Sequence, residues 1–260
     1  MGALHEGHLA LVREARRHAD DVVVSVFVNP TQFGPGEDFE RYPRDLEADL
    51  ERLRAVEAAA VFAPSDAEMY PGGRDANHTW VVVEELDRHL CGRYRPGHFR
   101  GVTTVVARLF TACKPHVAVF GLKDAQQFLI LRRMVRDLLF DVEMVGLPTV
   151  READGLALSS RNVYLGPRER EQAVVLSRAV RAARERIEAG EQEAGAIVET
   201  MRLTLAQASE GRVQYAEIVD VETLQPLDRV APGQKVLAAV AVHFGDTRLI
   251  DNAFAQAPAY

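Results

Sequence analysis

The chain has 260 residues, of which 47% are hydrophobic and 27% are charged, and its formal net charge is −7. This length suits one large domain or two modest ones, and the composition is ordinary for a globular protein. The acidic balance, with no long block of like charge, argues against nucleic acid as a partner, because nucleic-acid binding calls for a basic face. Anionic small substrates remain compatible with it through a local basic pocket.

No apolar run reaches the roughly 20 residues of a membrane-spanning helix. The first residues have neither the basic start nor the apolar core of a signal peptide. The two cysteines, Cys91 and Cys113, form no C-x-x-C pair and no zinc-type spacing. We therefore expect two free thiols, no membrane association and a cytoplasmic location.

The first half of the chain alternates amphipathic helical patterns with short apolar runs. The β-branched run at 22–28 is typical of a strand covered on both faces. Helices are expected at 9–18, 43–59, 102–113 and 124–138, and strands at 22–28, 60–63, 117–120 and 142–145. Strands that alternate with helices predict a Rossmann-like parallel sheet with helices on both faces.

The second half changes character. Helical patterns at 167–189 and 191–208 are followed by two expected strands at 213–219 and 235–242. This order predicts a smaller α+β domain. We expect the boundary near Pro148, with a nucleotide-binding domain at 1–148 and a C-terminal domain at 149–260.

Polar residues gather where the expected parallel strands end, which is the edge at which ligands of such sheets bind. The segment from Met1 to His8 runs directly into a helix, whose N-terminus attracts anions through unpaired N–H groups and its dipole. His5 and His8 can donate hydrogen bonds to phosphate oxygens and stabilise developing charge. Two alternatives stay open: the histidines are two ligands of a zinc ion, although no compelling third ligand is apparent, or they only cap the helix.

Two further segments combine basic and hydrogen-bonding side chains. Between Gly121 and Gln127, Lys123 can meet phosphate and Asp124 can accept hydrogen bonds from ribose, but a plain Asp helix cap is an open alternative. After the turn at 154–155, the run from Leu158 to Asn162 contains two hydroxyls and an arginine, which suit a phosphate clamp. A polar interdomain loop is the alternative there.

Two more segments flank the most apolar expected strand and the next helix. The residues at 28–33 carry a polar glutamine where a ligand would lie, and the residues at 95–101 form a basic Gly/Pro-rich segment. Either can be a simple turn. Together, the five segments bring basic and hydrogen-bonding groups to one sheet edge of an acidic protein.

The same segments carry a family resemblance. The H-x-G-H at a helix start is similar to the nucleotidyltransferase superfamily that includes class I aminoacyl-tRNA synthetases. The ordered set M-G-x-L-H-x-G-H, V-F-V-N-P-x-Q-F, R-Y-P-R, R-P-G-H-F-R-G-V, G-x-K-D-x-Q-Q and D-G-L-A-L-S-S-R-N resembles the pantoate–β-alanine ligase family. The resemblance is strong to about Tyr164 and weaker beyond, where Arg248 to Asn252 also match.

The resemblance implies ATP-dependent condensation of pantoate with β-alanine to pantothenate through a pantoyl-adenylate, with release of AMP and pyrophosphate. It implies Mg²⁺ as a helper, a homodimer, and a C-terminal domain that acts as a lid. The residues to which it assigns catalysis are His8, His5, Lys123 and Arg161. Those expected around ATP are Met1, Gly2, Ala3, Leu4, His5, Glu6, Gly7, His8, Gly121, Leu122, Lys123, Asp124, Val150 (by its backbone near the adenine), Leu158, Ser159, Ser160 and Arg161. Gln32 and Gln127 are expected to hold pantoate, with Gln32 also near β-alanine, and Asp49 is a candidate for the Mg²⁺ environment.

The chain departs from the family pattern at three places. Leu122 stands where the family commonly has Glu or Arg, and Ala125 stands where it commonly has an aromatic residue. Family members also carry a segment before Met1 that forms a central strand, and we expect that strand to be missing, which would leave unpaired backbone groups in the sheet. Two other functions therefore stay open: a nucleotidyltransferase with a different acceptor, and an inactive nucleotide-binding protein.

Overall fold

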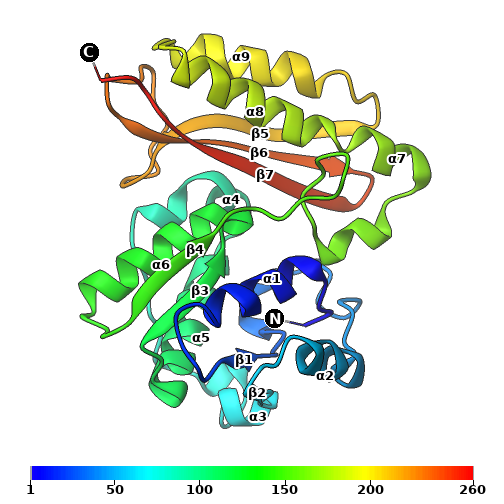
Figure 1. Cartoon of the computed structure of the whole chain (residues 1–260), viewed down its shortest axis with the longest axis vertical. Coiled ribbons are helices and arrows are strands. Elements are labelled where there is room, and N and C mark those ends of the chain that lie inside the picture. The colour runs from blue at the N-terminus through cyan, green and yellow to red at the C-terminus, as the bar shows by residue number, and fades with distance from the viewer. Residues whose placement is uncertain (1, 260) are drawn as a thin grey trace. The chain divides into compact units, whose positions relative to one another are not determined.

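The structure, a computed structural model, describes residues 2–259, and the chain divides into two compact units (Figure 1). The first unit comprises the residues up to Arg88 together with Gly92–Leu122 and Gln127–Pro148. The second comprises His89–Cys91, Lys123–Gln126 and the residues from Thr149 onward. The first holds parallel strands flanked by helices and the second an antiparallel sheet, so the expected α/β class with a smaller α+β part is confirmed.

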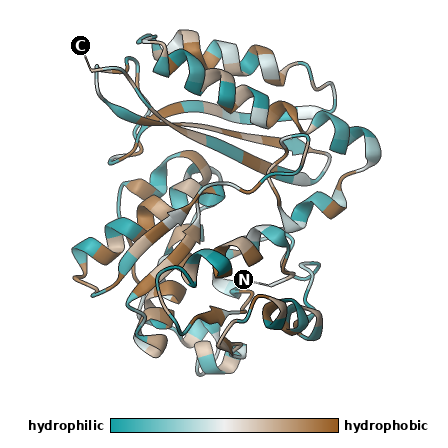
Figure 2. Ribbon diagram, in the orientation of Figure 1, coloured by the Kyte–Doolittle hydropathy of each residue, from teal (hydrophilic) through white to brown (hydrophobic). Residues whose placement is uncertain are grey.

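Helices and short strands alternate along the first unit. Its elements are α1 (Glu6–Ala15), β1 (Val23–Ser25), α2 (Leu46–Ala55), β2 (Ala60–Phe62), α3 (Asp66–Met69), α4 (Leu90–Tyr94), α5 (His98–Cys113), β3 (Val117–Gly121), α6 (Ala125–Asp137) and β4 (Glu143–Leu147). The first two residues of α4 and of α6 are counted with the second unit. The strands β3 and β4 consist largely of apolar residues, which are brown in Figure 2.

The parallel strands of this unit form two separate pairs, β1 with β2 and β3 with β4. One apolar cluster nevertheless takes side chains from both pairs, including Phe62 of β2 and Phe120 of β3. On the opposite face, α1 packs against β1 through Val12 and against β3 through Leu11. The two strand pairs thus share apolar contacts on both faces, although they are not hydrogen-bonded to each other.

Two elements differ from the sequence expectation at the edges that matter for function. The strand β1 covers only three residues of the apolar run at 22–28, and these pair with the three residues of β2. The helix α5 begins at His98 rather than at 102, since Gly97 takes a left-handed conformation (φ 79°) and turns the chain into the helix. The basic segment at 95–101 is therefore largely the first turn of a helix.

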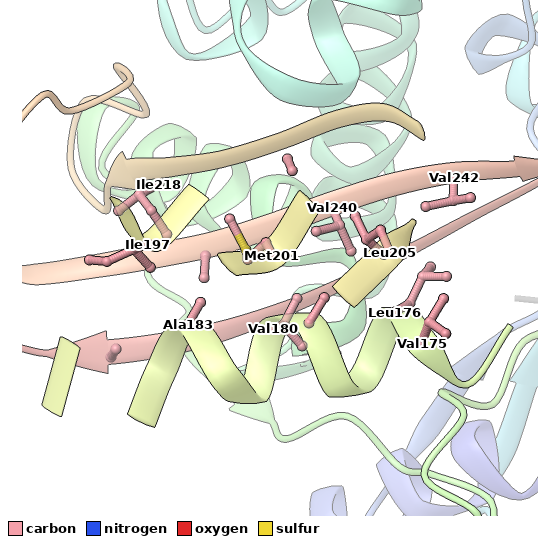
Figure 3. Packing of buried hydrophobic residues seen from close by; sticks show 14 of the residues in the cluster. Val175, Leu176, Val180, Ala183, Ile197, Met201, Leu205, Ile218, Val240 and Val242 are labelled. Atoms are coloured by element: carbon pink, nitrogen blue, oxygen red, sulfur yellow. The ribbon is translucent and has the colours of Figure 1, made fainter. Parts of the chain in front are cut away.

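The second unit is a three-stranded antiparallel sheet covered by helices. Its elements are α7 (Pro167–Gln172), α8 (Val175–Glu188), α9 (Ala194–Leu205), β5 (Gly211–Asp220), β6 (Lys235–Phe244) and β7 (Thr247–Gln256), with strand order β5-β6-β7. Side chains of both helices and of the sheet meet in one core, as Val180, Ile197 and Val240 do in Figure 3. The strand β7 was not expected from the sequence, and the single helix expected at 167–189 is divided into α7 and α8.

Two further observations concern membrane-spanning helices and the cysteines. No helix among residues 2–259 is long and apolar enough to cross a membrane. Cys91 is buried, Cys113 is exposed, and both are free thiols, as expected.

Candidate nucleotide and substrate site

The two histidines of the first motif form the N-terminal cap of α1. His5 is the N-cap residue, and its Nδ1 accepts a hydrogen bond from the Gly7 backbone N–H at 3.2 Å. The Nδ1 of His8 accepts from the backbone N–H of His5 at 3.2 Å, and the two ring centroids are 4.0 Å apart. The capping alternative therefore describes the local geometry correctly, and it does not compete with a role in binding phosphate.

These hydrogen bonds decide which nitrogen of each ring carries the proton. A nitrogen that accepts a hydrogen bond bears no hydrogen, so the neutral imidazoles of His5 and His8 carry their hydrogen on Nε2. Each Nε2–H is a donor held by the helix cap at the positive end of the α1 dipole. Phosphate oxygens are the natural acceptors for such a pair.

The residues before the cap are fixed by α2. The backbone N–H of Leu4 donates to Asp49 Oδ1 at 2.7 Å, and the Arg52 guanidinium donates to the Leu4 carbonyl. Ala3 has a φ of 48°, and Gly2 lies so close to Val28 that a Cβ would be 3.3 Å from that side chain. Met1 was also expected at the ATP site and lies outside the described residues.

Asp49 was the candidate for the Mg²⁺ environment. Its side chain is only 2% exposed, and one carboxylate oxygen is engaged by the Leu4 N–H. Within residues 2–259 no group of three or more His, Cys, Asp or Glu side chains is arranged to hold a metal ion. The geometry of Asp49 gives it a clear task, which is to anchor the segment that leads into the histidine cap.

Gln32 is held by a polar network that begins at Asn29. Asn29 is 3% exposed, and its Nδ2 donates to Gln32 Oε1 at 3.1 Å and to the Gly101 carbonyl at 3.2 Å. Its Oδ1 accepts from the hydroxyl of Tyr70 at 2.6 Å and from the hydroxyl of Thr31 at 3.1 Å. Burial raises the pKa of Tyr70, so this hydroxyl keeps its proton and remains a donor. The amide of Gln32 is thereby oriented.

The start of α5 supports the same segment from the other side. The Gln32 carbonyl lies 2.8 Å from His98 Nδ1 and accepts from the Arg95 guanidinium at 3.4 Å. Arg95 also pairs with Glu37 through two hydrogen bonds at 2.7 and 2.5 Å. Gly101 allows the backbone of Thr31 to approach so closely that a Cβ would lie 2.6 Å from its carbonyl oxygen. The two segments that sequence alone allowed to be separate turns are thus one assembly around Gln32.

The segment after β3 carries Lys123 and Asp124 in a short 3₁₀ helix, Leu122–Asp124. Lys123 Nζ is 4.0 Å from Asp124 Oδ2, and the Lys123 side chain is 22% exposed. Gly121 ends β3, and a Cβ on Gly146 of β4 would lie 2.7 Å from the Leu122 side chain. Leu122, where the family commonly has a charged residue, therefore packs on the sheet.

The neighbouring glutamines have different tasks. Gln126 is 5% exposed, its Oε1 accepts from the Cys91 N–H at 2.9 Å, and its Nε2 donates to the His89 carbonyl at 2.8 Å. Gln127 is half-buried in the first turn of α6. Gln126 is thus a structural residue, and Gln127 stays the candidate for binding pantoate.

The residues from Val150 to Arg161 form a folded turn in the second unit. The Val150 carbonyl accepts from the Leu158 N–H at 3.0 Å, and Gly155 turns the chain with a φ of 99°. Ser159 caps the following 3₁₀ helix, Ser160–Tyr164, because its Oγ accepts from the Arg161 N–H at 3.2 Å. Val150 and the Ser159–Arg161 segment are therefore parts of one structural element rather than two loops.

The expected residues are distributed over the two units. The first unit contains the His5–His8 cap at the start of α1, Gln32 after β1 and Gln127 in the first turn of α6. The second unit contains Lys123 and the Val150–Arg161 turn. Sequence reasoning missed the supporting residues, chiefly Tyr70, whose hydrogen bonds link positions about 40 residues apart along the chain.

Comparison with known proteins decides the family. The model of the pantoate-beta-alanine ligase family matches residues 1–254. The chain belongs to the pantoate–β-alanine ligase family. The expected function and enzyme class, ligation of pantoate to β-alanine, are therefore confirmed, and nucleotidyl transfer to another acceptor is set aside.

Relatives in this family are similar over nearly the whole chain. A pantothenate synthetase of Salinibacter ruber is 66% identical, with 99% of this chain and 89% of the relative covered. One of Thermotoga petrophila is 55% identical, with 97% and 88% covered. The crystal structure of pantothenate synthetase from Thermus thermophilus has a TM-score of 0.90 and 52% identity, with 97% and 90% covered.

A further solved structure bears on ligands. Pantoate-beta-alanine ligase from Francisella tularensis, solved in complex with beta-gamma ATP and beta-alanine, has a TM-score of 0.77 and 32% identity. The alignment covers 97% of this chain and 86% of that one.

Proposed function

We propose that the chain makes pantothenate in two steps at the expense of ATP. In the first, a carboxylate oxygen of pantoate attacks the α-phosphorus of ATP, and the bond to the β-phosphate oxygen breaks, which gives pantoyl-adenylate and pyrophosphate. In the second, the amine of β-alanine attacks the activated carbonyl carbon, loses a proton, and displaces AMP. The observation that carries this proposal is the pair of Nε2–H donors held at the start of α1 in a chain of this family.

The chemical demand of the first step explains the donors. Two anions must approach each other, and negative charge grows on the phosphate oxygens in the transition state. The Nε2–H groups of His5 and His8 would donate hydrogen bonds to those oxygens, and these two residues are the catalytic donors of the proposal. Because the cap fixes both rings before the substrate binds, little reorganisation is needed when the charge develops.

The remaining roles follow from the chemistry of the side chains. We assign Lys123 and Arg161 to the phosphates, Asp124 to the ribose hydroxyls, and the backbone near Val150 to the adenine. Ser159 and Ser160 add hydroxyl donors. The remaining nucleotide contacts are assigned to three stretches of backbone: Gly2 to Gly7, Gly121 to Leu122, and Leu158. Gln32 and Gln127 would hold the hydroxyl and carboxylate groups of pantoate, with Gln32 also near β-alanine.

Mg²⁺ enters this scheme as part of the nucleotide substrate. Mg²⁺ prefers octahedral oxygen ligands and is commonly held by substrate phosphates, waters and one or two carboxylates rather than by a protein cage. The described residues fit that mode, since they offer isolated carboxylates such as Asp124 and no cluster of three. The ion would neutralise phosphate charge when the nucleotide is bound.

The test of this proposal is an omission assay. Release of AMP is measured with ATP, Mg²⁺, pantoate and β-alanine, and each component is then left out in turn. We expect AMP only in the complete mixture, and pyrophosphate exchange into ATP that requires pantoate but not β-alanine. AMP release that does not depend on pantoate would refute the proposal. The resemblance further supports a cytoplasmic location and a homodimer. Light scattering of the purified protein tests the homodimer, because it measures the molar mass in solution.

A further inference from the structure

Two consecutive residues of β7 form hydrogen bonds with two segments of the second unit that carry nucleotide-binding candidates. We propose that Asp251 and Asn252 are positioning residues for ATP: Asn252 holds the Lys123 segment, and Asp251 holds the Val150–Arg161 turn through Arg151. The inference rests on the proposed function, and it assigns a role to the C-terminal match at 248–252, which the chemistry described above does not use.

Asn252 fixes the backbone at Lys123. Its Nδ2 donates to the Lys123 carbonyl at 2.8 Å, although the two residues are 129 positions apart in sequence. Asn252 is only 8% exposed, so this bond is shielded from competing water. A carbonyl held in this way fixes the direction in which the Lys123 side chain leaves the backbone.

Asp251 fixes the turn on the other side of the strand. Its two carboxylate oxygens accept from the Arg151 guanidinium at 2.6 and 2.9 Å, in a bidentate pair. The same guanidinium donates to the Gly155 carbonyl at 3.1 Å, which closes the turn onto itself. Arg151 also forms a β-bridge with Ala157, and Ala157 lies two residues before Ser159. The pair therefore ties the adenine end and the Ser159–Arg161 end of the turn to β7.

The location of Asp251 is hard to explain by stability alone. Its side chain is 1% exposed, and it shares a strand face with Leu249 and Ala255, which belong to the apolar core under α8 and α9. A buried ion pair gains little over apolar side chains of similar volume, because desolvation offsets the attraction. A carboxylate, however, accepts two parallel hydrogen bonds from a guanidinium and thereby fixes the plane of Arg151.

Strand geometry explains how two neighbours reach two segments. Successive side chains of a β-strand point to opposite faces, so Asp251 and Asn252 project in opposite directions from one rigid support. The strand β7 is paired with β6 along its whole length, from Thr247 to Gln256. The paired strand therefore fixes the spacing between the Lys123 segment and the Val150–Arg161 turn. A nucleotide that is bound both by its base and by its phosphates requires such a fixed spacing.

Four variants test the proposal: N252D, N252A, D251N and the control Q256A. N252D keeps the shape of the side chain and replaces the donor by an acceptor. Gln256 lies on the same strand and also donates an amide hydrogen bond to a backbone carbonyl, that of Gly233 at 3.1 Å, away from the candidate residues. The readouts are kcat and KM for MgATP in pantoate-dependent ATP–pyrophosphate exchange, the ratio of ATP to GTP use, and the melting temperature.

The expected results differ between the two residues. N252D and N252A lower kcat of the exchange about tenfold to a hundredfold, since Lys123 is displaced from the reacting phosphates. D251N raises the KM for MgATP about tenfold and lowers the ratio of ATP to GTP use. The reason is that the backbone near Val150, which is assigned to the adenine, is held less firmly. The KM for pantoate changes little in all of them, and Q256A behaves as the wild type.

The proposal is overturned if N252D and D251N melt earlier but keep wild-type kcat, KM and nucleotide preference below their melting temperatures. It is equally overturned if Q256A shows the same kinetic losses. N252D, with its isosteric side chain, keeps the test decisive if D251N does not fold. A wild-type chain without pantoate-dependent exchange would refute the proposed function instead, and calorimetric binding of MgATP to the wild type and D251N would then still measure the role of Asp251.

Discussion

Replacing Gly101 by alanine places a methyl group against the backbone that carries Gln32. The added Cβ would lie 2.6 Å from the Thr31 carbonyl oxygen, 2.7 Å from its carbon and 2.8 Å from the Gln32 nitrogen, whereas ordinary contacts begin at about 3.4 Å. The 3₁₀ helix Pro30–Gln32 must therefore retreat by about 0.8 Å, since none of these atoms belongs to a flexible side chain.

Two energies oppose each other in this variant. Overpacking of this kind costs about 1–3 kcal/mol, and alanine gains up to about 1 kcal/mol over glycine inside a helix. We expect a net loss of about 1 kcal/mol in the free energy of unfolding. The displacement matters more for catalysis, because a misplacement of about 1 Å in a substrate-positioning group can cost up to roughly a hundredfold in rate. The kcat/KM for pantoate should fall by about ten- to a hundredfold.

The assay combines urea unfolding with the kinetics of pantoate-dependent pyrophosphate exchange. The matched control is G195A in α9, where the exposed glycine has no atom within 4 Å of the added Cβ. This control should be as stable as the wild type or slightly more stable, with unchanged kinetics. The reasoning is refuted if G101A loses stability but keeps the wild-type KM and kcat for pantoate, because Gln32 would then not be a pantoate ligand.

Three further predictions follow from the site, the turn and the core. H8A should lower the rate of adenylation about 10²–10³-fold, as loss of one preorganised donor does; near-wild-type exchange kinetics would exclude His8 from the chemistry. The hydrogen bond from Arg170 lowers the pKa of Asp154, so this carboxylate stabilises the fold above its unfolded pKa of about 3.9 and loses that contribution as the pH falls through its lower folded pKa. In urea unfolding, D154N should therefore have a lower free energy of unfolding than the wild type at pH 7, and this difference should vanish at acid pH. The control D246N should show no such difference, and a loss in D154N that is independent of pH would contradict a role for the charged Asp154 carboxylate. I197A should lower the free energy of unfolding by about 2–5 kcal/mol, because Ile197 is 0% exposed, whereas L203A on the same helix, 63% exposed, should change it by less than about 0.5 kcal/mol.

Much of the fold was accessible from local patterns. Period and composition predicted the alternation of helices and strands and the change of character after Pro148, because both depend on residues close together in the chain. Element ends were less accurate. The helix α1 begins at Glu6 because the His5 cap sets its start, and an apolar period gives no information about a cap formed by histidines.

The candidate site divides in the same way. The residue types of the motifs, such as His8, Lys123 and Arg161, were apparent from the sequence because chemistry selects them directly. Their supports were not. The sequence showed Asn29 as one polar residue of the segment at 28–33, and the structure shows it to be the centre of the network that orients Gln32.

The sequence by itself determined the chemistry of this protein: histidines at a helix start, a lysine and an arginine after turns, and an acidic chain around them. The tertiary structure alone decided how those groups are held. It fixed the tautomers of His5 and His8, seated Gly101 against Thr31, and joined Asp251 and Asn252 to segments more than 90 residues away. The physical reason is that hydrogen bonds and close contacts depend on distance in space, and a sequence pattern records only distance along the chain.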